Sequence, residues 1–169
     1  MECKKINKIV AVFLVVATFA LDQWSKAEVL GNPLLSGYTT IEITSFFNLV
    51  LVFNRGVSFG MFAGYNQPLL LIIFALIIIS VLLVWLWRSK SVMVTTGIGL
   101  VVGGAAGNVV DRIRYGAVVD FLDFHLGELH WPAFNLADSF VFIGVVVLCV
   151  HSLFFEDRQS AKPNSSTQQ

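Results

Sequence analysis

The chain has 169 residues, of which 56% are hydrophobic and only 13% charged, and its formal net charge is zero. This composition excludes an ordinary soluble domain, in which about a quarter of the residues are charged, and the balanced charge gives no sign of nucleic-acid binding. The mean hydropathy of +0.78 indicates an integral membrane protein. Because each span needs about 20 apolar residues, the chain has room for only a few.

Four apolar segments are long enough to cross a bilayer: residues 6–30, 69–87, 92–110 and 139–155. The first follows the basic stretch "KKINK" and so also resembles the front of a cleavable signal peptide. Because three further spans follow, we interpret it as the uncleaved first helix of a polytopic protein, with Trp24 as an interfacial anchor. We predict one membrane domain over residues 1–158 and a disordered tail over residues 159–169.

Basic and acidic residues are segregated between the two sides of these spans. The two termini and the tight turn between spans two and three hold most of the basic residues, which predicts that they are cytoplasmic. The two long loops then face outward, and they and the span ends beside them hold eight of the eleven acidic residues. These eight are Asp22, Glu28, Glu42, Asp111, Asp120, Asp123, Glu128 and Asp138.

The loop over residues 31–67 is too long to be a bare connector. Its stretch "TTIEITSFFNLVLVF" alternates polar and apolar positions and is rich in β-branched and aromatic residues, which is typical of strands. We predict a small β-rich element on the outer membrane surface, with its aromatic face toward lipid or substrate. Asn54 and Gly56 in the following "NRGVSFG" indicate a turn that brings the backbone close to a neighbour.

The third span carries small residues at four-residue spacing, at Gly99, Gly103 and Gly107. This pattern lets a second helix backbone approach closely, so we expect a packing face there.

Three polar residues follow on one helical face, because Asn108, Asp111 and Arg112 are spaced at i, i+3 and i+4. The pair of Asp111 and Arg112 is either an anchor at the membrane edge or part of a site wall. The residues alone leave both open.

Two aspartates lie where charge is expensive. Asp120 is inside the apolar stretch "VVDFLDF", and Asp138 is at the start of the fourth span. A charged group at membrane depth costs about 2.5 to 3.5 kcal/mol even on mild scales, whereas a helix N-cap contributes about 1 kcal/mol. Asn135 or Ser139 could also cap that helix. We therefore predict that Asp120 and Asp138 have a functional role, with the N-cap as the alternative for Asp138.

Two neighbouring carboxylates can share one proton and so supply an acid and a base together, as in aspartic proteases. This chemistry needs no cofactor. A metal site is not predicted, because His125, Glu128 and His130 in "HLGELH" miss the known zinc spacing by one residue. Two other classes stay open: a small proton-coupled transporter that uses these carboxylates, and a non-catalytic assembly subunit.

Five motifs in order resemble the lipoprotein signal peptidase family, bacterial signal peptidase II, over nearly the whole chain: "DQWSK", "NRGVSFG", "GGAAGNVVDRI", "VVDF" and "FNLADS". The chain departs from the family pattern at Val57, where alanine is more usual. The resemblance implies an α-helical membrane protein with four transmembrane helices and a small β-rich extracytoplasmic element between helices one and two. By the same resemblance, the catalytic pair is Asp120 and Asp138, the substrate-site residues are Asn54, Gly56, Asn108, Arg112 and Asn135, and the structural motif residues are Asp22, Lys26 and Asp111.

The family's activity gives the expected function. The resemblance implies an intramembrane aspartic endopeptidase of the bacterial inner membrane that removes signal peptides from prolipoproteins, cutting before the diacylglyceryl-modified cysteine. The expected partners are these lipidated precursors, membrane lipids and globomycin-type cyclic peptide inhibitors, and no cofactor or metal is expected. We expect a monomer with both termini in the cytoplasm and the active site toward the outer face.

Overall fold

The structure is a computed structural model that describes residues 2–35, 37, 39–56 and 67–155. The predicted tail over residues 159–169 and the family departure at Val57 lie outside the described residues.

Four helices form the body of the molecule: α1 (Glu2–Leu30), α2 (Gln67–Arg88), α3 (Val92–Tyr115) and α4 (Leu136–Phe155). Within the described residues, all four are long and apolar enough to cross a membrane, which confirms the predicted four-span architecture. α3 continues beyond residue 110, and α4 begins before residue 139. For α3 the difference arises because the apolar run stops at Val110, whereas the helical hydrogen bonds continue until Gly116 adopts a left-handed conformation with φ 67°.

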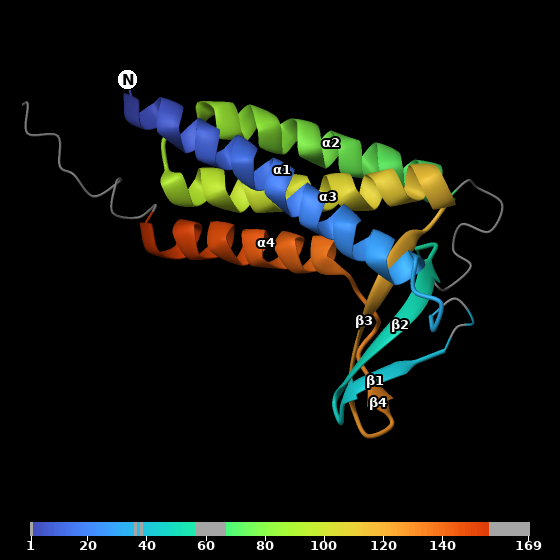
Figure 1. The fold of residues 1–169 in the computed structure, drawn as a ribbon. Helices are drawn as coiled ribbons and strands as arrows, with labels where there is room; N and C mark the ends of the chain where they lie inside the picture. The colour runs from blue at the N-terminus through green and yellow to red at the C-terminus, as the bar shows by residue number, and fades with distance from the viewer. Residues whose placement is uncertain (1, 36, 38, 57–66, 156–169) are drawn as a thin grey trace, which may run out of the picture.

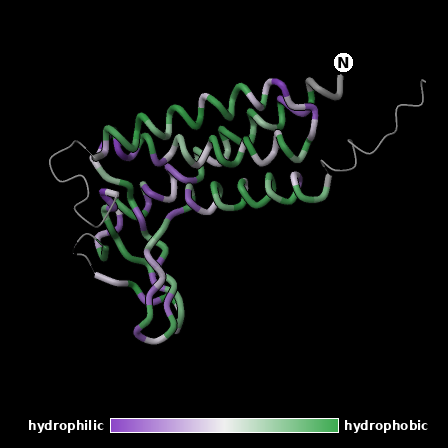
Figure 2. The backbone as a smooth tube through the Cα atoms, turned by 180° about the vertical axis from the view of Figure 1, so that it is seen from behind, coloured by the Kyte–Doolittle hydropathy of each residue, from purple (hydrophilic) through white to green (hydrophobic). Residues whose placement is uncertain are grey.

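α3 is the central helix of the bundle. Most of its span is buried, whereas only a small part of the α2 and α4 spans is buried within the molecule. Figure 1 shows the helices side by side, with the start of α1 and the end of α4 at the end of the bundle opposite the sheet. Hydrophobic residues make up most of the length of the helices (Figure 2), as expected for helices that span a membrane.

The small residues of α3 face two different helices. A Cβ added at Gly99, Gly103 or Gly107 would meet α1, at Ala11, Thr18 and Asp22 respectively. Gly104 lies against the backbone oxygen of Ala137 at the start of α4 instead. The predicted packing face is therefore confirmed, and it extends to a second side of α3. This close approach brings the first turn of α4 next to the polar end of α3.

A four-stranded antiparallel sheet lies at one end of the bundle. Its strands are β1 (Ile41–Thr44), β2 (Phe47–Asn54), β3 (Val118–Leu126) and β4 (Leu129–His130), in that spatial order. The first two form the predicted β-rich element between α1 and α2. β3 and β4 come from the loop between α3 and α4, and these two strands were not predicted from the sequence. The sheet extends sideways from the bundle, across the direction of the helices (Figure 1).

We predict that Gly104→Ala destabilises the protein, although alanine is favoured over glycine in a helix by about 1 kcal/mol. The new methyl group would meet the Ala137 backbone oxygen and the Val141 side chain, and such overpacking costs about 1 to 3 kcal/mol. Thermal unfolding in detergent measures the effect. Gly37→Ala is the control, because the added Cβ would lie 3.5 Å from Thr39 Oγ1, an ordinary contact. A Gly104→Ala protein as stable as the parent would contradict the close packing of α3 on α4.

Candidate active site

Asp120 and Asp138 are brought together by the pairing of the chain on both sides of them. Asp120 lies on β3, which starts directly after α3, and Asp138 lies in the first turn of α4. The segment before α4 is fixed to β3, because the Leu122 and Phe134 backbones exchange hydrogen bonds of 2.8 and 3.1 Å. This pairing brings the start of α4 to the face of β3 that carries Asp120.

The N-cap of α4 is Asn135, not Asp138. The Asn135 Oδ1 atom accepts a hydrogen bond of 2.9 Å from the Asp138 backbone N–H, which is the geometry of a capping side chain. A second free N–H of this turn, that of Ala137, donates to Asp22 Oδ1 of α1 at 2.9 Å. The capping interpretation of Asp138 is therefore wrong, and its carboxylate is available for another role.

A chain of hydrogen bonds through two asparagines connects the two carboxylates. Asn108 Nδ2 donates to Asp138 Oδ1 at 2.8 Å, and Asn135 Nδ2 donates to Asp120 Oδ1 at 2.6 Å. The two amides also contact each other, from Asn135 Nδ2 to Asn108 Oδ1 at 3.3 Å. Asn54 Nδ2 of β2 binds the second Asp120 oxygen at 3.0 Å. The Asn54, Asn108 and Asn135 side chains predicted to line the site are thus in direct contact with the aspartates.

Gly56 has an indirect place in this arrangement. Its backbone N–H donates to Asn54 Oδ1 at 2.9 Å, and its φ of 97° is a conformation that favours glycine. The resulting turn orients the Asn54 amide so that its nitrogen meets Asp120. Gly56 therefore shapes the site through Asn54.

A buried ion pair network lies beneath the asparagines. Lys26 Nζ is 2.9 Å from Asp22 Oδ2 and 2.7 Å from Asp111 Oδ2, and all three side chains are almost fully buried. The same ammonium donates to Asn108 Oδ1 at 3.0 Å. Asp111 Oδ2 also accepts from the Val119 backbone N–H at 3.2 Å, at the start of β3. These motif residues therefore hold the elements that carry the asparagines and Asp120.

Gln23 also belongs to this network, although no role was predicted for it from the sequence. Its Nε2 donates to Asp111 Oδ1 at 3.0 Å, and its Oε1 accepts from Arg114 at 3.3 Å. Its position within "DQWSK", one residue after Asp22, is the feature of the sequence from which a role could have been predicted.

Arg112 is the one cation of α3 that faces the carboxylate pair. Its Nη1 donates to the Asn108 backbone oxygen at 3.3 Å, and its charge attracts Asp138, Asp120 and Asp111. Its Nε is buried and has no hydrogen-bond partner within the described residues. The charge of this partly exposed side chain therefore lies beside the carboxylates, which supports the site-wall interpretation over a simple membrane anchor.

The surroundings of Asp120 favour its protonated form. The side chain is 1% exposed, and this burial raises the pKa of Asp120 to about 6, an effect that the Asp138 charge adds to and that the hydrogen bonds from Asn54 and Asn135 oppose. Asp138 is only partly buried. The two carboxyl groups therefore differ in environment, which is the condition for one to hold a proton while its partner is ionised.

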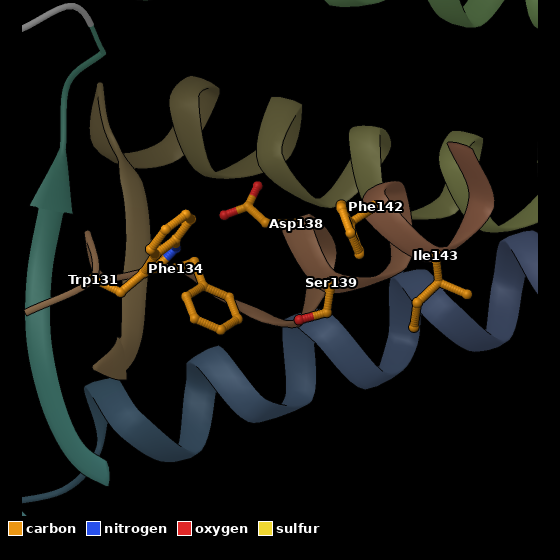
Figure 3. Close-up of a pocket in the computed structure, with 6 residues that line it drawn as sticks. All are labelled: Trp131, Phe134, Asp138, Ser139, Phe142 and Ile143. Carbon is orange, nitrogen blue, oxygen red and sulfur yellow. The ribbon is translucent and has the colours of Figure 1, made fainter. Parts of the chain in front are cut away.

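A mostly apolar pocket of about 400 Å³ opens beside Asp138. Its lining was not predicted as a group and comes from the segment before α4 and from α4 itself: Trp131, Phe134, Asp138, Ser139, Phe142 and Ile143. In Figure 3 the Asp138 carboxylate lies between the aromatic residues of the segment before α4 and the α4 side chains. A peptide with apolar neighbours could thus place a bond beside this carboxylate.

The histidines of "HLGELH" lie on the sheet, away from this pocket. His130 Nδ1 is 2.9 Å from Asp123 Oδ1, and its ring stacks on His125 with centroids 4.8 Å apart. Burial alone would raise the pKa of Asp123, but hydrogen bonds from His130 and Asn48 outweigh it and lower the pKa. No cluster of three or more possible metal ligands is found among the described residues. This group ties β2, β3 and β4 together.

The fold and site define a helical integral membrane protein with a carboxylate pair at one end of its bundle. Residues 14–154 match the family profile described as signal peptidase (SPase) II. The chain is 46% identical over 150 residues to the lipoprotein signal peptidase of Anaplasma marginale (strain Florida), covering 88% of this chain and 87% of that protein. It is 43% identical over 155 residues to the lipoprotein signal peptidase of Aeromonas hydrophila, covering 89% and 92%.

A bacterial membrane enzyme solved by the in meso method at 2.3 Å resolution has a similar structure, with a TM-score of 0.76 and 26% identity over 90% of this chain and 92% of that chain. The chain belongs to the signal peptidase II family, the lipoprotein signal peptidases. It is therefore a bacterial membrane peptidase, and the resemblance noted in the sequence is confirmed.

We predict that Lys26→Met lowers the free energy of unfolding by about 3 to 5 kcal/mol, because it leaves the buried carboxylates of Asp22 and Asp111 without their cation. Thermal unfolding in detergent and the amount of folded protein measure the loss. The double variant Lys26→Met/Asp111→Asn should recover part of it, since it removes one of the two unpaired charges. Lys90→Met, at an exposed position, is the control. Equal stability of Lys26→Met and Lys90→Met would contradict the structural role of this network.

Proposed function

We propose that the chain is an aspartic endopeptidase that removes signal peptides from prolipoproteins, with Asp120 and Asp138 as its catalytic pair. The observation that carries the proposal is the continuous hydrogen-bonded path from Asp120 through Asn135 and Asn108 to Asp138, at the edge of an apolar pocket. Membership of the signal peptidase II family supports the reaction and the substrate class.

The two carboxyl groups have different roles in this proposal. Asp138 is partly exposed at the pocket and acts as the base that removes a proton from water. Asp120 is fully buried, has a raised pKa, and holds the proton that is given to the oxygen of the scissile carbonyl. Water adds to the carbonyl carbon to form a tetrahedral intermediate. The C–N bond then breaks as the proton on Asp138 passes to the leaving nitrogen and the carbonyl proton returns to Asp120.

The asparagines and Arg112 orient the groups that react. Asn108 and Asn135 each hold one oxygen of a catalytic carboxylate, which leaves the other Asp138 oxygen to contact water. Both asparagines are neutral, so they position the two carboxyl groups. A cation in their place would more strongly favour ionisation of both aspartates. The partly exposed guanidinium of Arg112 would bind a substrate carbonyl, and Asn54 would belong to the same wall.

The apolar pocket and the exposed α4 surface suit a substrate that is anchored in lipid. Acyl chains of a diacylglyceryl cysteine would remain in the bilayer beside Phe142 and Ile143, and each methylene buried from water would stabilise this membrane anchoring by about 0.8 kcal/mol. The peptide would meet the polar wall at the end of the bundle. We therefore propose cleavage just before the modified cysteine, with the anchor fixing the depth of the scissile bond. Globomycin-type cyclic peptides would occupy the same pocket.

The arrangement of charge supports an orientation in the bacterial inner membrane. The basic residues at the ends of the chain and at Arg88 and Lys90 favour the cytoplasmic side. β3, which carries Asp120, and the first turn of α4, which carries Asp138, lie at the opposite, sheet end of the bundle (Figure 1). We propose that both termini are cytoplasmic, that the active site faces outward, and that the enzyme acts as a monomer.

The proton-coupled transporter interpretation finds no support in this geometry. Transport carboxylates lie near the membrane midplane between repeated halves, whereas Asp120 is on a strand beyond the end of α3. The assembly-subunit interpretation gives no reason for the carboxylate pair.

We predict that Asp120→Asn and Asp138→Asn each lower the rate of prolipoprotein cleavage about a thousandfold or more, because asparagine cannot exchange a proton with water or the carbonyl. The α4 cap should persist in Asp138→Asn, since Asn135 supplies it. Cleavage of a lipidated prolipoprotein by purified protein is the measurement, with thermal unfolding to show that each variant is folded. Asp123→Asn, an acid of the same strand that binds His130 instead, is the matched control and should remain active. Substantial activity of either site variant would exclude the proposed pair.

We predict that kcat/KM falls as pH rises above about 6, as Asp120 loses the proton that it donates. Asn54→Ala should move this decline to higher pH by about half to one unit. The Asn54 hydrogen bond favours the ionised form, and its removal raises the Asp120 pKa further. The pH profile of the two enzymes is the measurement. Asn48→Ala is the matched control, because this amide on the same strand binds Asp123. A decline at unchanged pH in Asn54→Ala would contradict the assignment of Asp120 as the acid.

A further inference from the structure

The outer half of the sheet has one polar and one apolar face. Residues paired across antiparallel strands point to the same face, and neighbours along a strand point to opposite faces. Asn48 pairs with Glu42 on one side and Asp123 on the other, and His125 pairs with His130. These five residues make one face polar across all four strands.

The opposite face of the same strands is apolar. Phe47 pairs with Phe124, and their rings stack with centroids 4.8 Å apart. Leu126 pairs with Leu129 at the end of the sheet, and Trp131 follows Leu129 by two residues. Exposed fractions are 80% for Leu126, 75% for Leu129 and 68% for Trp131. We call the surface formed by Phe124, Leu126, Leu129 and Trp131 the hairpin patch.

The hairpin patch is on the face of the sheet that is turned toward the helices. Phe124 follows Asp120 by four residues on β3, so both side chains point to one face, and Asp120 contacts Asn135 beside α4. The ring of Phe124 also stacks on Phe134, with centroids 5.9 Å apart. Because the sheet extends sideways from the bundle (Figure 1), this face overlies the space beside α4 rather than the helices themselves.

The patch is continuous with a surface that contacts lipid. Trp131 and Phe134 line the same pocket as Phe142 and Ile143 of α4, and these α4 side chains are exposed on a membrane span. Large exposed apolar residues in a row mark an interaction surface, and tryptophan is enriched at the boundary between lipid and water. The polar face is then the one that meets the aqueous side.

We propose that the hairpin patch inserts into the outer leaflet of the bilayer beside α4, so that the β3–β4 hairpin is a second membrane anchor of the enzyme. The bilayer is its partner whether or not substrate is present. The anchor holds β3 at a fixed depth, and with it Asp120. It also places Trp131 and Phe134 at the point where the pocket meets lipid. The proposal depends on the membrane-spanning bundle and not on the assignment of the catalytic pair.

Single-cysteine variants of the full chain test this insertion in lipid vesicles. In a Cys3→Ser/Cys149→Ser background, Leu126→Cys and Leu129→Cys are each labelled with an environment-sensitive fluorophore. We expect blue-shifted emission, quenching by lipids that carry a nitroxide near the headgroup, and weak quenching by aqueous iodide. The matched control is Glu42→Cys, an exposed position on the polar face, and its label should respond in the opposite way. Thermal unfolding in detergent shows that each labelled variant is folded.

Three results would overturn the proposal. The first is a label at 126 or 129 that iodide quenches as strongly as the label at 42. The second is a label that becomes shielded only when lipidated prolipoprotein is added, which would identify the patch as a substrate-docking surface.

The third comes from the unlabelled double variant Leu126→Glu/Leu129→Glu. We expect its cleavage rate to fall several-fold in vesicles but not in detergent micelles, where no leaflet fixes the depth of the sheet. An equal fall in both media would indicate damage to the site rather than loss of an anchor.

Discussion

The structure depends on one buried ammonium group. Lys26 of α1 binds Asp22 of its own helix and Asp111 and Asn108 of α3. Through these partners it reaches the other elements of the site, because Asp22 accepts from the first turn of α4 and Asp111 accepts from the start of β3. Burying an ammonium group carries a desolvation penalty, which only oppositely charged and hydrogen-bonding partners can offset. The cluster thus fixes the angles at which three helices and a strand meet.

Close helix packing makes this cluster possible. Gly107 leaves room for the Asp22 carboxylate against α3, and Gly104 lets α3 approach the backbone of α4. A side chain at either position would separate the helices that share the ion network. Small residues and buried charges are therefore two parts of one arrangement: the first allows the approach, and the second makes it specific.

The site combines strong and weak electrostatic contacts in separate layers. The cation and its two carboxylates lie in the deeper layer, and neutral amides separate them from Asp120 and Asp138. Direct contact with Lys26 would favour the ionised form of both aspartates. Through Asn108 and Asn135 the lysine contributes position without direct contact, and burial keeps the pKa of Asp120 raised although the Lys26 charge lowers it. The sheet separates Asp120 from the polar group around Asp123, because the two side chains point to opposite faces of β3.

The sequence by itself determined the four spans and the family, and it predicted which residues form the site. Spans follow from local hydropathy, which each segment carries without reference to the others, and Asp120 and Asp138 were prominent because charge is rare in apolar surroundings.

Contacts between distant segments could not be predicted in this way. Either Asp138 or Asn135 has a side chain that could cap α4. Only the contacts of α4 with Asp22 and β3 show that Asn135 is the cap and that the Asp138 carboxylate is not used for capping. "VVDFLDF" has no strict alternation because both of its faces are largely covered at its start, so its identity as β3 emerged only from pairing with β2. The same pairing separates the two faces of the outer sheet, since register across strands is a property of the tertiary structure alone.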